Sequence, residues 1–377
     1  MNSNDYDVIV IGVGAMGSAA CWRLADRGAR VLGLEQFDIP HARGSSHGYS
    51  RMIRLAYHEH PDYVPLLRRA YELWDELQRI SGQPLLHITG GAHAGPGNSE
   101  QLRQIEATAQ AHQLPYERFD AAELARRFPG FQMPADYEVI FEPTAGFLRP
   151  EATISAQAIQ ALSAGARIQA HEPVVRWRAA ANGIFIETTR GEYRCQKAIV
   201  CGGAWSQQLL ASLNVPLRVT RQAQGWVWPR RPELFQLGRF PVWSVALEDG
   251  SCYYGFPMLG DVPGLKTAHH KRADETTADT VDRNPRPEDE ADFRGAFRFL
   301  PDADGPLLGI RICMYTNTPD GHFVVDRHPE DERIVLACGF SGHGFKFASV
   351  IGEILSELAL DGRTQHPARF LGLRRFM

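Results

Sequence analysis

The sequence predicts an α/β fold in which two domains are interleaved along the chain. A short apolar run near the N-terminus enters a glycine-rich turn, and two later apolar runs also end in glycines. The stretches between them have a different pattern of helices and short strands. A chain of 377 residues with 44% hydrophobic residues can bury more than one core. We therefore expect one largely parallel sheet with helices and a second α+β domain built on a mixed antiparallel sheet.

The first element is a buried strand that runs directly into a glycine turn. Residues 8–11 are Val-Ile-Val-Ile, and the turn has the pattern Gly12-x-Gly14-x-x-Gly17. Glycines at this spacing allow the backbone to come close to a pyrophosphate. The turn is therefore a candidate nucleotide site.

A helix, a second strand and an acidic residue follow this turn. Residues 18–27 have the apolar spacing of a helix, and residues 30–34 form a strand that ends at Glu35. A carboxylate at this position accepts hydrogen bonds from a ribose diol. The whole segment predicts a Rossmann-type βαβ unit, and its pattern fits FAD and NAD equally.

Two later segments indicate that the chain returns to this domain. Residues 197–201 form a strand that ends in paired glycines, after a hairpin expected within 172–193. Residues 333–338 form another strand, which enters the glycine-rich turn 339–344 before a helix at 347–360. Such a turn offers free N–H groups and the positive end of a helix dipole to a ligand. Because flavin reduction places negative charge on the ring, the late return favours FAD.

The remaining stretches predict the second domain. They contain helical segments and short strands at 64–80, 99–112, 121–128, 226–228 and 251–256. The charged stretch 272–290 is expected to be a solvated face.

The predicted domain boundaries follow from these patterns. We assign residues 1–85, 145–217 and 305–377 to the FAD-binding domain, and residues 86–144 and 218–304 to the substrate domain.

Composition limits the classes of partner. The net charge of −4 and a pI of about 6.4 predict no nucleic acid and no membrane surface as partner, so a small molecule is expected. The acidic N-terminus is unlike a signal peptide, and no apolar run reaches membrane-spanning length. Scattered cysteines predict neither a metal site nor disulfides and fit the cytoplasm. They are Cys21, Cys195, Cys201, Cys252, Cys313 and Cys338.

Six separated segments carry motifs that occur together in one family. They are Gly12-x-Gly14-x-x-Gly17, 44–54, 253–257, 264–266, 313–315 and 342–347. With them the sequence resembles the monomeric sarcosine oxidase and N-methyltryptophan oxidase family of FAD-dependent amine oxidases over essentially its whole length. The resemblance implies a monomer whose FAD is attached through its 8α-methyl group to Cys313, with the active site on the re face and oxygen as electron acceptor.

The resemblance also implies roles for individual residues. Arg54 and Lys346 resemble the pair that binds the substrate carboxylate, which suits an Arg fork and a Lys point charge. Lys266 resembles the lysine that activates oxygen, since a fixed cation stabilises developing superoxide. We expect further site residues beside the flavin and the substrate amine, namely His47, Arg51, Tyr254, His270 and, for substrate binding, Tyr315.

The expected cofactor site combines the fingerprint with the family motifs. It comprises Gly12, Gly14, Ala15, Met16, Gly17, Glu35, Ser45, Arg51, Val174, Gly202, Trp205, Cys313, Gly342, Gly344, Phe345 and Lys346. The sequence departs from the family where Tyr49-Ser50 replaces an Asp-Thr pair and where Trp226 and Trp228 add bulk. The side-chain pocket of the substrate is thus the least defined part of the site.

The expected reaction is oxidation of an N-methyl or secondary amino acid to an imine, which hydrolyses, with release of hydrogen peroxide. Sarcosine would give glycine and formaldehyde; N-methyltryptophan, proline and pipecolate are alternative substrates. A dehydrogenase that passes electrons to a protein or quinone, or a flavoprotein that binds FAD without catalysis, would use the same nucleotide domain.

Overall fold

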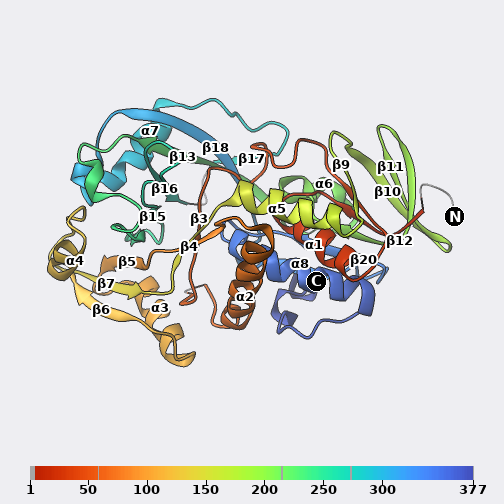
Figure 1. The fold of residues 1–377 in the computed structure, drawn as a ribbon, viewed down its shortest axis with the longest axis horizontal. Helices are drawn as coiled ribbons and strands as arrows, with labels where there is room; N and C mark the ends of the chain where they lie inside the picture. Colours follow the sequence, from red (N-terminus) through yellow and green to blue (C-terminus); the bar gives the residue numbers. More distant parts are fainter. Residues whose placement is uncertain (1–4, 58, 214, 272–273, 377) are drawn as a thin grey trace.

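The structure is a computed structural model that describes residues 5–57, 59–213, 215–271 and 274–376. Two large sheets organise the chain, one toward each end of the long axis (Figure 1). The sheet nearest the N-terminus lies on the right in this view, and strands β5, β6, β7 and β15 of the other lie on the left. The predicted α/β class with two interleaved sheets is confirmed.

The first sheet has eight strands. They are β1 (Asp5–Ile11), β2 (Val31–Leu34), β9 (Arg167–Gln169), β10 (Val174–Ala180), β11 (Gly183–Thr188), β12 (Gly191–Val200), β19 (Val324–Arg327) and β20 (Ile334–Cys338). Strands β9, β2, β1, β12 and β20 are parallel, and the hairpin β10–β11 and strand β19 are antiparallel additions. Helix α1 (Ala15–Asp26) links β1 to β2. This is the predicted Rossmann-type βαβ unit, and its helix begins three residues earlier than expected.

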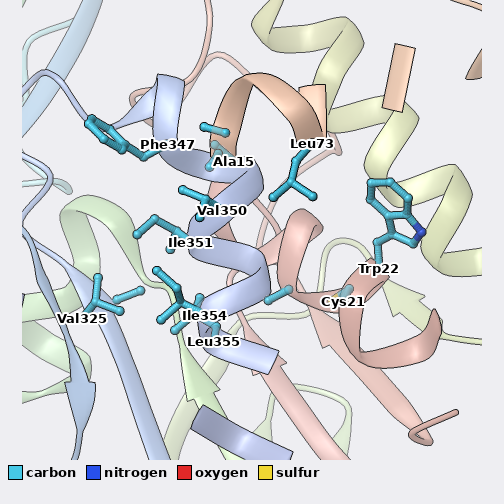
Figure 2. Packing of buried hydrophobic residues seen from close by; sticks show 14 of the residues in the cluster. Ala15, Cys21, Trp22, Leu73, Val325, Phe347, Val350, Ile351, Ile354 and Leu355 are labelled. Carbon is cyan, nitrogen blue, oxygen red and sulfur yellow. The ribbon is translucent and has the colours of Figure 1, made fainter. Parts of the chain in front are cut away.

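Four helices pack beside this sheet, namely α1, α2 (Tyr63–Ser81), α5 (Pro150–Ser163) and α8 (Ala348–Asp361). In Figure 2, Val350, Ile351 and Ile354 of α8 pack in one cluster with Leu73 of α2. A Cβ on Gly352 would lie 2.6 Å from the backbone carbon of Ala19, so the glycine allows α8 to pack tightly on α1. The apolar cluster fixes the glycine turns at the ends of β1 and β20.

The second sheet has nine strands. They are β5 (Gly91–Pro96), β6 (Glu117–Asp120), β7 (Tyr137–Glu142), β13 (Arg218–Val227), β14 (Val242–Ala246), β15 (Cys252–Gly255), β16 (Leu265–His270), β17 (Glu275–Thr276) and β18 (Leu307–Asn317). Its pairs are antiparallel except for β5 with β14, which are parallel. It is the expected mixed sheet.

The two faces of this sheet differ in chemistry because side chains alternate along each strand. Trp243, Val245 and Tyr253 belong to an apolar core shared with Phe293 of helix α7 (Pro287–Arg294). Their sequence neighbours therefore project from the opposite face, where the registers align Ser244 with Tyr254 and Trp226 with Lys266. The registers also place Cys252 opposite His270 and Gln222 opposite Cys313. One face is thus a core, and the other carries Tyr254, Lys266, His270, Cys313 and Tyr315 of the predicted site.

Smaller elements lie along the chain between the strands of the two large sheets. They are a three-stranded sheet of β3 (Arg51–Ile53), β4 (Leu86–Ile88) and β8 (Gly146–Leu148), and helices α3 (Glu100–Ala111), α4 (Ala121–Arg127) and α6 (Ser206–Leu209). Strand β3 carries Arg51.

Two sequence expectations differ from the structure. Strand β18 pairs with β13 in the second sheet, although we assigned residues 305–377 to the FAD-binding domain. A division by sheets would move this boundary to about residue 318. The charged stretch 272–290 is not wholly solvated, because Asp289 is buried in an ion pair of 2.6 Å with Arg221. Residues 272 and 273 lie outside the described residues.

Candidate active site

A cavity lies between the glycine turns of the first sheet and the face of the second sheet that carries Tyr254 and His270. One end is lined by the turn after β1 and by Glu35, and the other by Arg54, Glu59 and Tyr254. Most of the predicted cofactor residues line it, namely Gly12, Gly14, Ala15, Met16, Glu35, Ser45, Arg51, Val174, Gly202, Trp205, Gly342, Gly344, Phe345 and Lys346. Gly17 and Cys313 lie just outside the lining.

The three fingerprint glycines have separate structural roles. Gly12 has a φ of +88°, and a Cβ there would lie 2.5 Å from the Cys201 carbonyl oxygen. A Cβ on Gly17 would collide with the Gly12 carbonyl. Gly14 has nothing within 4 Å of a Cβ position and lies at the start of α1, so its backbone is open to the cavity. A pyrophosphate can therefore approach the N–H groups at this helix start, as FAD binding requires.

Glu35 occupies the position expected for ribose recognition. Its Oε2 accepts a hydrogen bond of 2.9 Å from the Val13 backbone N–H, and its Oε1 accepts one of 3.1 Å from Phe37. The carboxylate is thus held beside the glycine turn, and its remaining lone pairs can accept from a diol.

The turn before α8 brings backbone to the middle of the cavity. Gly339, Ser341 and Gly342 have φ values of +65°, +49° and +81°. A Cβ on Gly342 would lie 2.6 Å from the Tyr315 ring. Only a glycine fits there, so the aromatic ring of β18 and the turn of the first sheet approach each other closely across the cavity.

Arg51 and Cys313 lie beside each other at the cavity wall. The Arg51 guanidinium donates hydrogen bonds of 2.8 Å to the carbonyls of Ser45 and Ser50, and its Nη2 lies 3.8 Å from the Cys313 sulfur. That sulfur is also 3.6 Å from the Ser45 carbonyl oxygen. Because Arg51 and Ser45 line the cavity, the thiol lies directly behind its wall.

Lys266 is buried behind the same wall. Its Nζ donates hydrogen bonds of 2.8 Å and 2.9 Å to the carbonyls of Gly48 and Ser50. It also lies 4.9 Å from the centre of the Phe256 ring. Burial, and then the positive charge of Arg51, hold the pKa of Lys266 well below its usual range.

His47 is a buried imidazole with unsatisfied hydrogen-bonding groups. It is 1% exposed, and neither ring nitrogen has a hydrogen-bond partner among the described residues. Burial, followed by the charges of Arg51 and Lys266, lowers its pKa to about 3, so the ring is neutral. Unpaired buried polar atoms are costly, so this neighbourhood fits a bound group that supplies partners.

Arg54 and Lys346 converge at the far end of the cavity. The Arg54 guanidinium donates to the Ala56 carbonyl at 2.9 Å and pairs with the Glu59 carboxylate at 3.0 Å. The Lys346 ammonium donates to the His343 carbonyl at 2.8 Å and lies 3.3 Å from the Tyr57 hydroxyl. Burial, followed by the charge of Arg54, lowers the pKa of Lys346 to about 7.

His343 and Tyr57 position this pair of cations. The His343 Nε2 lies 2.9 Å from the Gly321 carbonyl oxygen, which can only accept, so the proton is on Nε2. Nδ1 therefore accepts from the Tyr57 hydroxyl at 2.5 Å. Burial lowers the pKa of His343 to about 3, which keeps this neutral tautomer.

Tyr254 of β15, His270 of β16 and Tyr315 of β18 line the cavity. The His270 Nδ1 lies 3.0 Å from the Tyr315 hydroxyl. Burial raises the pKa of Tyr254 and that of Tyr315, so both phenols are protonated and available as hydrogen-bond donors.

The sequence analysis missed several cavity residues. Glu59, which pairs with Arg54, Gln101 at the start of α3, and Ser244 of β14 all line the cavity. Ser244 could have been noticed, because it interrupts the apolar strand 242–246. The pairing of Glu59 depends on the irregular backbone after β3 and has no sequence signal.

The fold and the cavity are those of a dinucleotide-binding protein in which a second large sheet faces the nucleotide-binding turns. Residues 7–358 match the family model described as FAD dependent oxidoreductase. The chain is 41% identical to a monomeric sarcosine oxidase of Streptomyces avermitilis, over 99% of this chain and 98% of that protein. It is 34% identical to an N-methyl-L-tryptophan oxidase of Yersinia pestis, over 99% and 100%. This chain therefore belongs to the family of FAD-dependent oxidoreductases that includes these amine oxidases.

Solved structures agree with this assignment. NikD, an amino acid oxidase of nikkomycin biosynthesis, superposes with a TM-score of 0.87 at 25% identity, covering 98% of each chain. Glycine oxidase from Geobacillus kaustophilus, at 21% identity and a TM-score of 0.84, covers all of both chains and shows the same fold. The predicted family, fold and FAD cofactor are confirmed.

Two further observations bound the site. Within the described ranges, no group of three or more His, Cys, Asp or Glu side chains is arranged to hold a metal ion. No helix in the same part of the chain has the length and apolar character needed to cross a membrane.

Proposed function

We propose that the protein oxidises small secondary amino acids of the sarcosine type and passes the electrons to oxygen, producing hydrogen peroxide. One observation carries the proposal: two buried cations, Arg54 and Lys346, converge at the end of a cavity whose opposite end fits FAD. A carboxylate is the anion that an Arg fork and a nearby ammonium suit.

The two cations would bind and orient the substrate. Arg54 already holds the Glu59 carboxylate at 3.0 Å, so its geometry suits a carboxylate. A substrate carboxylate would share or replace that contact and would gain the Lys346 ammonium as a second partner. Fixing the carboxylate in this way sets the position of the amine and its C–H bonds, which lowers the entropic part of the barrier.

The amine must react in its neutral form, because its lone pair assists loss of the C–H hydrogen with its electrons. The charges of Arg54 and Lys346 disfavour a further ammonium nearby. Bound FAD supplies the two-electron acceptor for this oxidation. The imine product hydrolyses, so sarcosine would give glycine and formaldehyde.

Lys266 and Cys313 have proposed roles on the cofactor side. The buried Lys266 cation, held by two carbonyls, would stabilise the negative charge that develops when oxygen is reduced. Cys313 would hold FAD covalently, which its position behind Ser45 and Arg51 supports. Arg51, Tyr254, His270 and Tyr315 line the cavity and, together with the buried His47, would complete the surroundings of the ring and the amine.

We also propose that the protein is a monomer in the cytoplasm. The cysteines of the described chain are all free, which suits a reducing compartment. Light scattering on the purified protein would measure the mass against the 42.1 kDa of one chain.

An anaerobic titration tests the reaction. Sarcosine should bleach the yellow protein without oxygen, and air should restore the colour with one peroxide per amine oxidised. Bleaching without peroxide in air would identify a dehydrogenase. No bleaching by sarcosine, N-methyltryptophan, proline or pipecolate would mean that the protein is not an oxidase of such amines.

A further inference from the structure

Three polar but uncharged side chains line the same cavity as Arg54 and Lys346, the two cations proposed to bind the substrate carboxylate. These three side chains have no part in the proposed reaction. They are Ser244 in the middle of β14, Cys252 at the start of β15, and Gln101 in the first turn of α3. This wall, formed by Ser244, Cys252 and Gln101, is called the neutral polar wall below.

Ser244 is the least expected residue of the neutral polar wall. Its strand is Val-Trp-Ser-Val-Ala, and Trp243 and Val245 beside it belong to the apolar core on the opposite face. Ser244 is 6% exposed, and a buried hydroxyl is costly unless it is hydrogen-bonded. Its Oγ lies 2.8 Å from Nδ1 of His93, which is itself 1% exposed.

The strand registers explain why His93 reaches Ser244 and why Ser244 faces the cavity. His93 of β5 is opposite Ser244, and Ser244 is opposite Tyr254 of β15. Residues directly opposite each other in a sheet project from the same face. The row His93, Ser244, Tyr254 therefore leads from a buried imidazole to a phenol that lines the proposed substrate end of the cavity.

The bond to His93 leaves Ser244 free to make another hydrogen bond. If Nδ1 carries the proton, it donates to Oγ and the serine hydroxyl hydrogen can be donated to a ligand. If Nδ1 accepts from the hydroxyl, the lone pairs of Oγ can accept from a ligand. His93 acts through Ser244 and is a positioning residue.

Cys252 and Gln101 extend the neutral polar wall without adding charge. Burial raises the pKa of the Cys252 thiol to about 12, so the thiol stays protonated, and the Gln101 amide is neutral by nature. Arg54, Lys346 and Glu59 line the same cavity as the three residues of the wall.

We infer that the neutral polar wall is a subsite for a hydroxyl or carboxamide on the substrate side chain, so that the preferred substrate is a secondary amino acid with a short, neutral, polar side chain. The inference rests on the proposed amino acid oxidation. An apolar side chain would leave the Ser244 hydroxyl desolvated without a new partner, and a site of this kind discriminates against analogues that lack the matching group. A charged side chain would find no counter-charge on the wall.

Matched substrate pairs test this inference on the holoenzyme. N-methyl-DL-serine is compared with N-methyl-DL-2-aminobutyrate, and N-methyl-DL-asparagine with N-methyl-DL-leucine, since each pair differs in polarity and little in shape. We expect kcat/KM to favour the polar member of at least one pair by about tenfold, the usual effect of one matched hydrogen bond. Ratios near one for both pairs would overturn the inference.

Variants locate the source of the preference. In Ser244→Ala the ratio should fall to near one, and Ser244→Cys, which keeps the volume, should lower it if the alanine protein does not fold. His93→Leu should lower the ratio of kcat/KM between the polar and the apolar substrate. His93→Asn can place a polar atom where the histidine Nδ1 was, and this variant should keep part of the preference. Ser356→Ala is the control, since it removes a buried hydroxyl that donates to a carbonyl within α8 at 2.8 Å. An unchanged ratio in Ser244→Ala would contradict the subsite.

Calorimetry separates this inference from the proposed reaction. If sarcosine and all four amino acids fail to reduce the flavin, the proposed function fails, and dissociation constants for the same pairs then decide about the subsite. About tenfold tighter binding of a polar member, lost in Ser244→Ala, would support it. Equal constants would overturn it.

Discussion

The Arg54 guanidinium and the Glu59 carboxylate lie 3.0 Å apart at the end of the cavity, although Arg54 is a proposed anchor for the substrate carboxylate. Both side chains are largely buried, so the attraction is less screened by solvent than at a surface. An incoming carboxylate therefore competes with a group that the protein supplies itself. Removing that competitor should change affinity in a predictable direction.

We predict that Glu59→Gln binds simple carboxylates more tightly. The dissociation constant of propionate, followed by the perturbation of the flavin spectrum, should fall by about threefold or more, since one ion pair no longer has to be broken. Glu76→Gln is a matched control. The Glu76 carboxylate lies 2.7 Å from the Arg23 guanidinium, and neither residue lines the cavity. Weaker propionate binding in Glu59→Gln would show that Glu59 holds Arg54 in its binding position.

Arg54→Met completes this comparison. Loss of one charged partner of a buried carboxylate should weaken binding by about 2–5 kcal/mol. An unchanged propionate affinity would remove Arg54 from the binding site.

Lys346 should make carboxylate binding depend on pH. Its pKa is lowered to about 7, so the side chain is a cation below that pH and a neutral amine above it. Propionate affinity should therefore be greatest below pH 7 and decrease by about 25-fold between pH 6.5 and 8.5, as expected for binding coupled to one proton. Propionate has no amine, so the substrate nitrogen does not contribute to the profile.

Lys346→Met provides the control for this profile. The variant should bind propionate weakly and with little dependence on pH over the same range. If the wild-type and variant profiles run parallel, another group titrates.

Cys313→Ser should release the flavin from covalent attachment. After precipitation with acid, the wild-type pellet should keep its yellow colour, while the variant should lose it to the supernatant. Cys338→Ser is a suitable control, since Cys338 is also a free, buried cysteine at the end of a strand. Wild-type colour found only in the supernatant would refute covalent attachment at any residue.

Lys266→Met should slow the reaction with oxygen much more than the reaction with substrate. Loss of one preorganised charge costs on the order of a hundredfold in rate. Stopped-flow spectroscopy measures the two half-reactions separately. Similar slowing of both would make Lys266 a structural residue, which its hydrogen bonds to Gly48 and Ser50 would also explain.

Reoxidation in the wild type should in addition become slower at alkaline pH. Since the pKa of Lys266 lies well below its usual range, the cation is lost at a lower pH than for an exposed lysine. Reoxidation of Lys266→Met should lack this decrease.

The sequence predicted those parts of the site whose partners are local or carry a strong motif. The βαβ unit from β1 to β2 is continuous, so Gly12, Gly14 and Glu35 could be placed together from spacing alone. Ser244 and His93 are 151 residues apart, and their contact exists only because β5 and β14 pair in parallel. The residue pattern within each strand does not indicate which other strand it pairs with, so the contact was not predicted.

The sheet to which β18 belongs could not be predicted for a similar reason. Strand β18 has the apolar pattern of either sheet, and only its antiparallel register with β13 decides to which sheet it belongs. Local pattern predicts that a strand exists, whereas strand pairing is a long-range property of the fold.

The alternation of side chains along β14 and β15 separates stability from substrate choice. Trp243, Val245 and Tyr253 are constrained by the apolar core, whereas their sequence neighbours Ser244 and Cys252 line the cavity. A single substitution at Ser244 or Cys252 can alter what the cavity accepts and leave the core contacts in place. Descendants of this chain could acquire new substrates through such changes at alternate positions, with little loss of folding stability along the way.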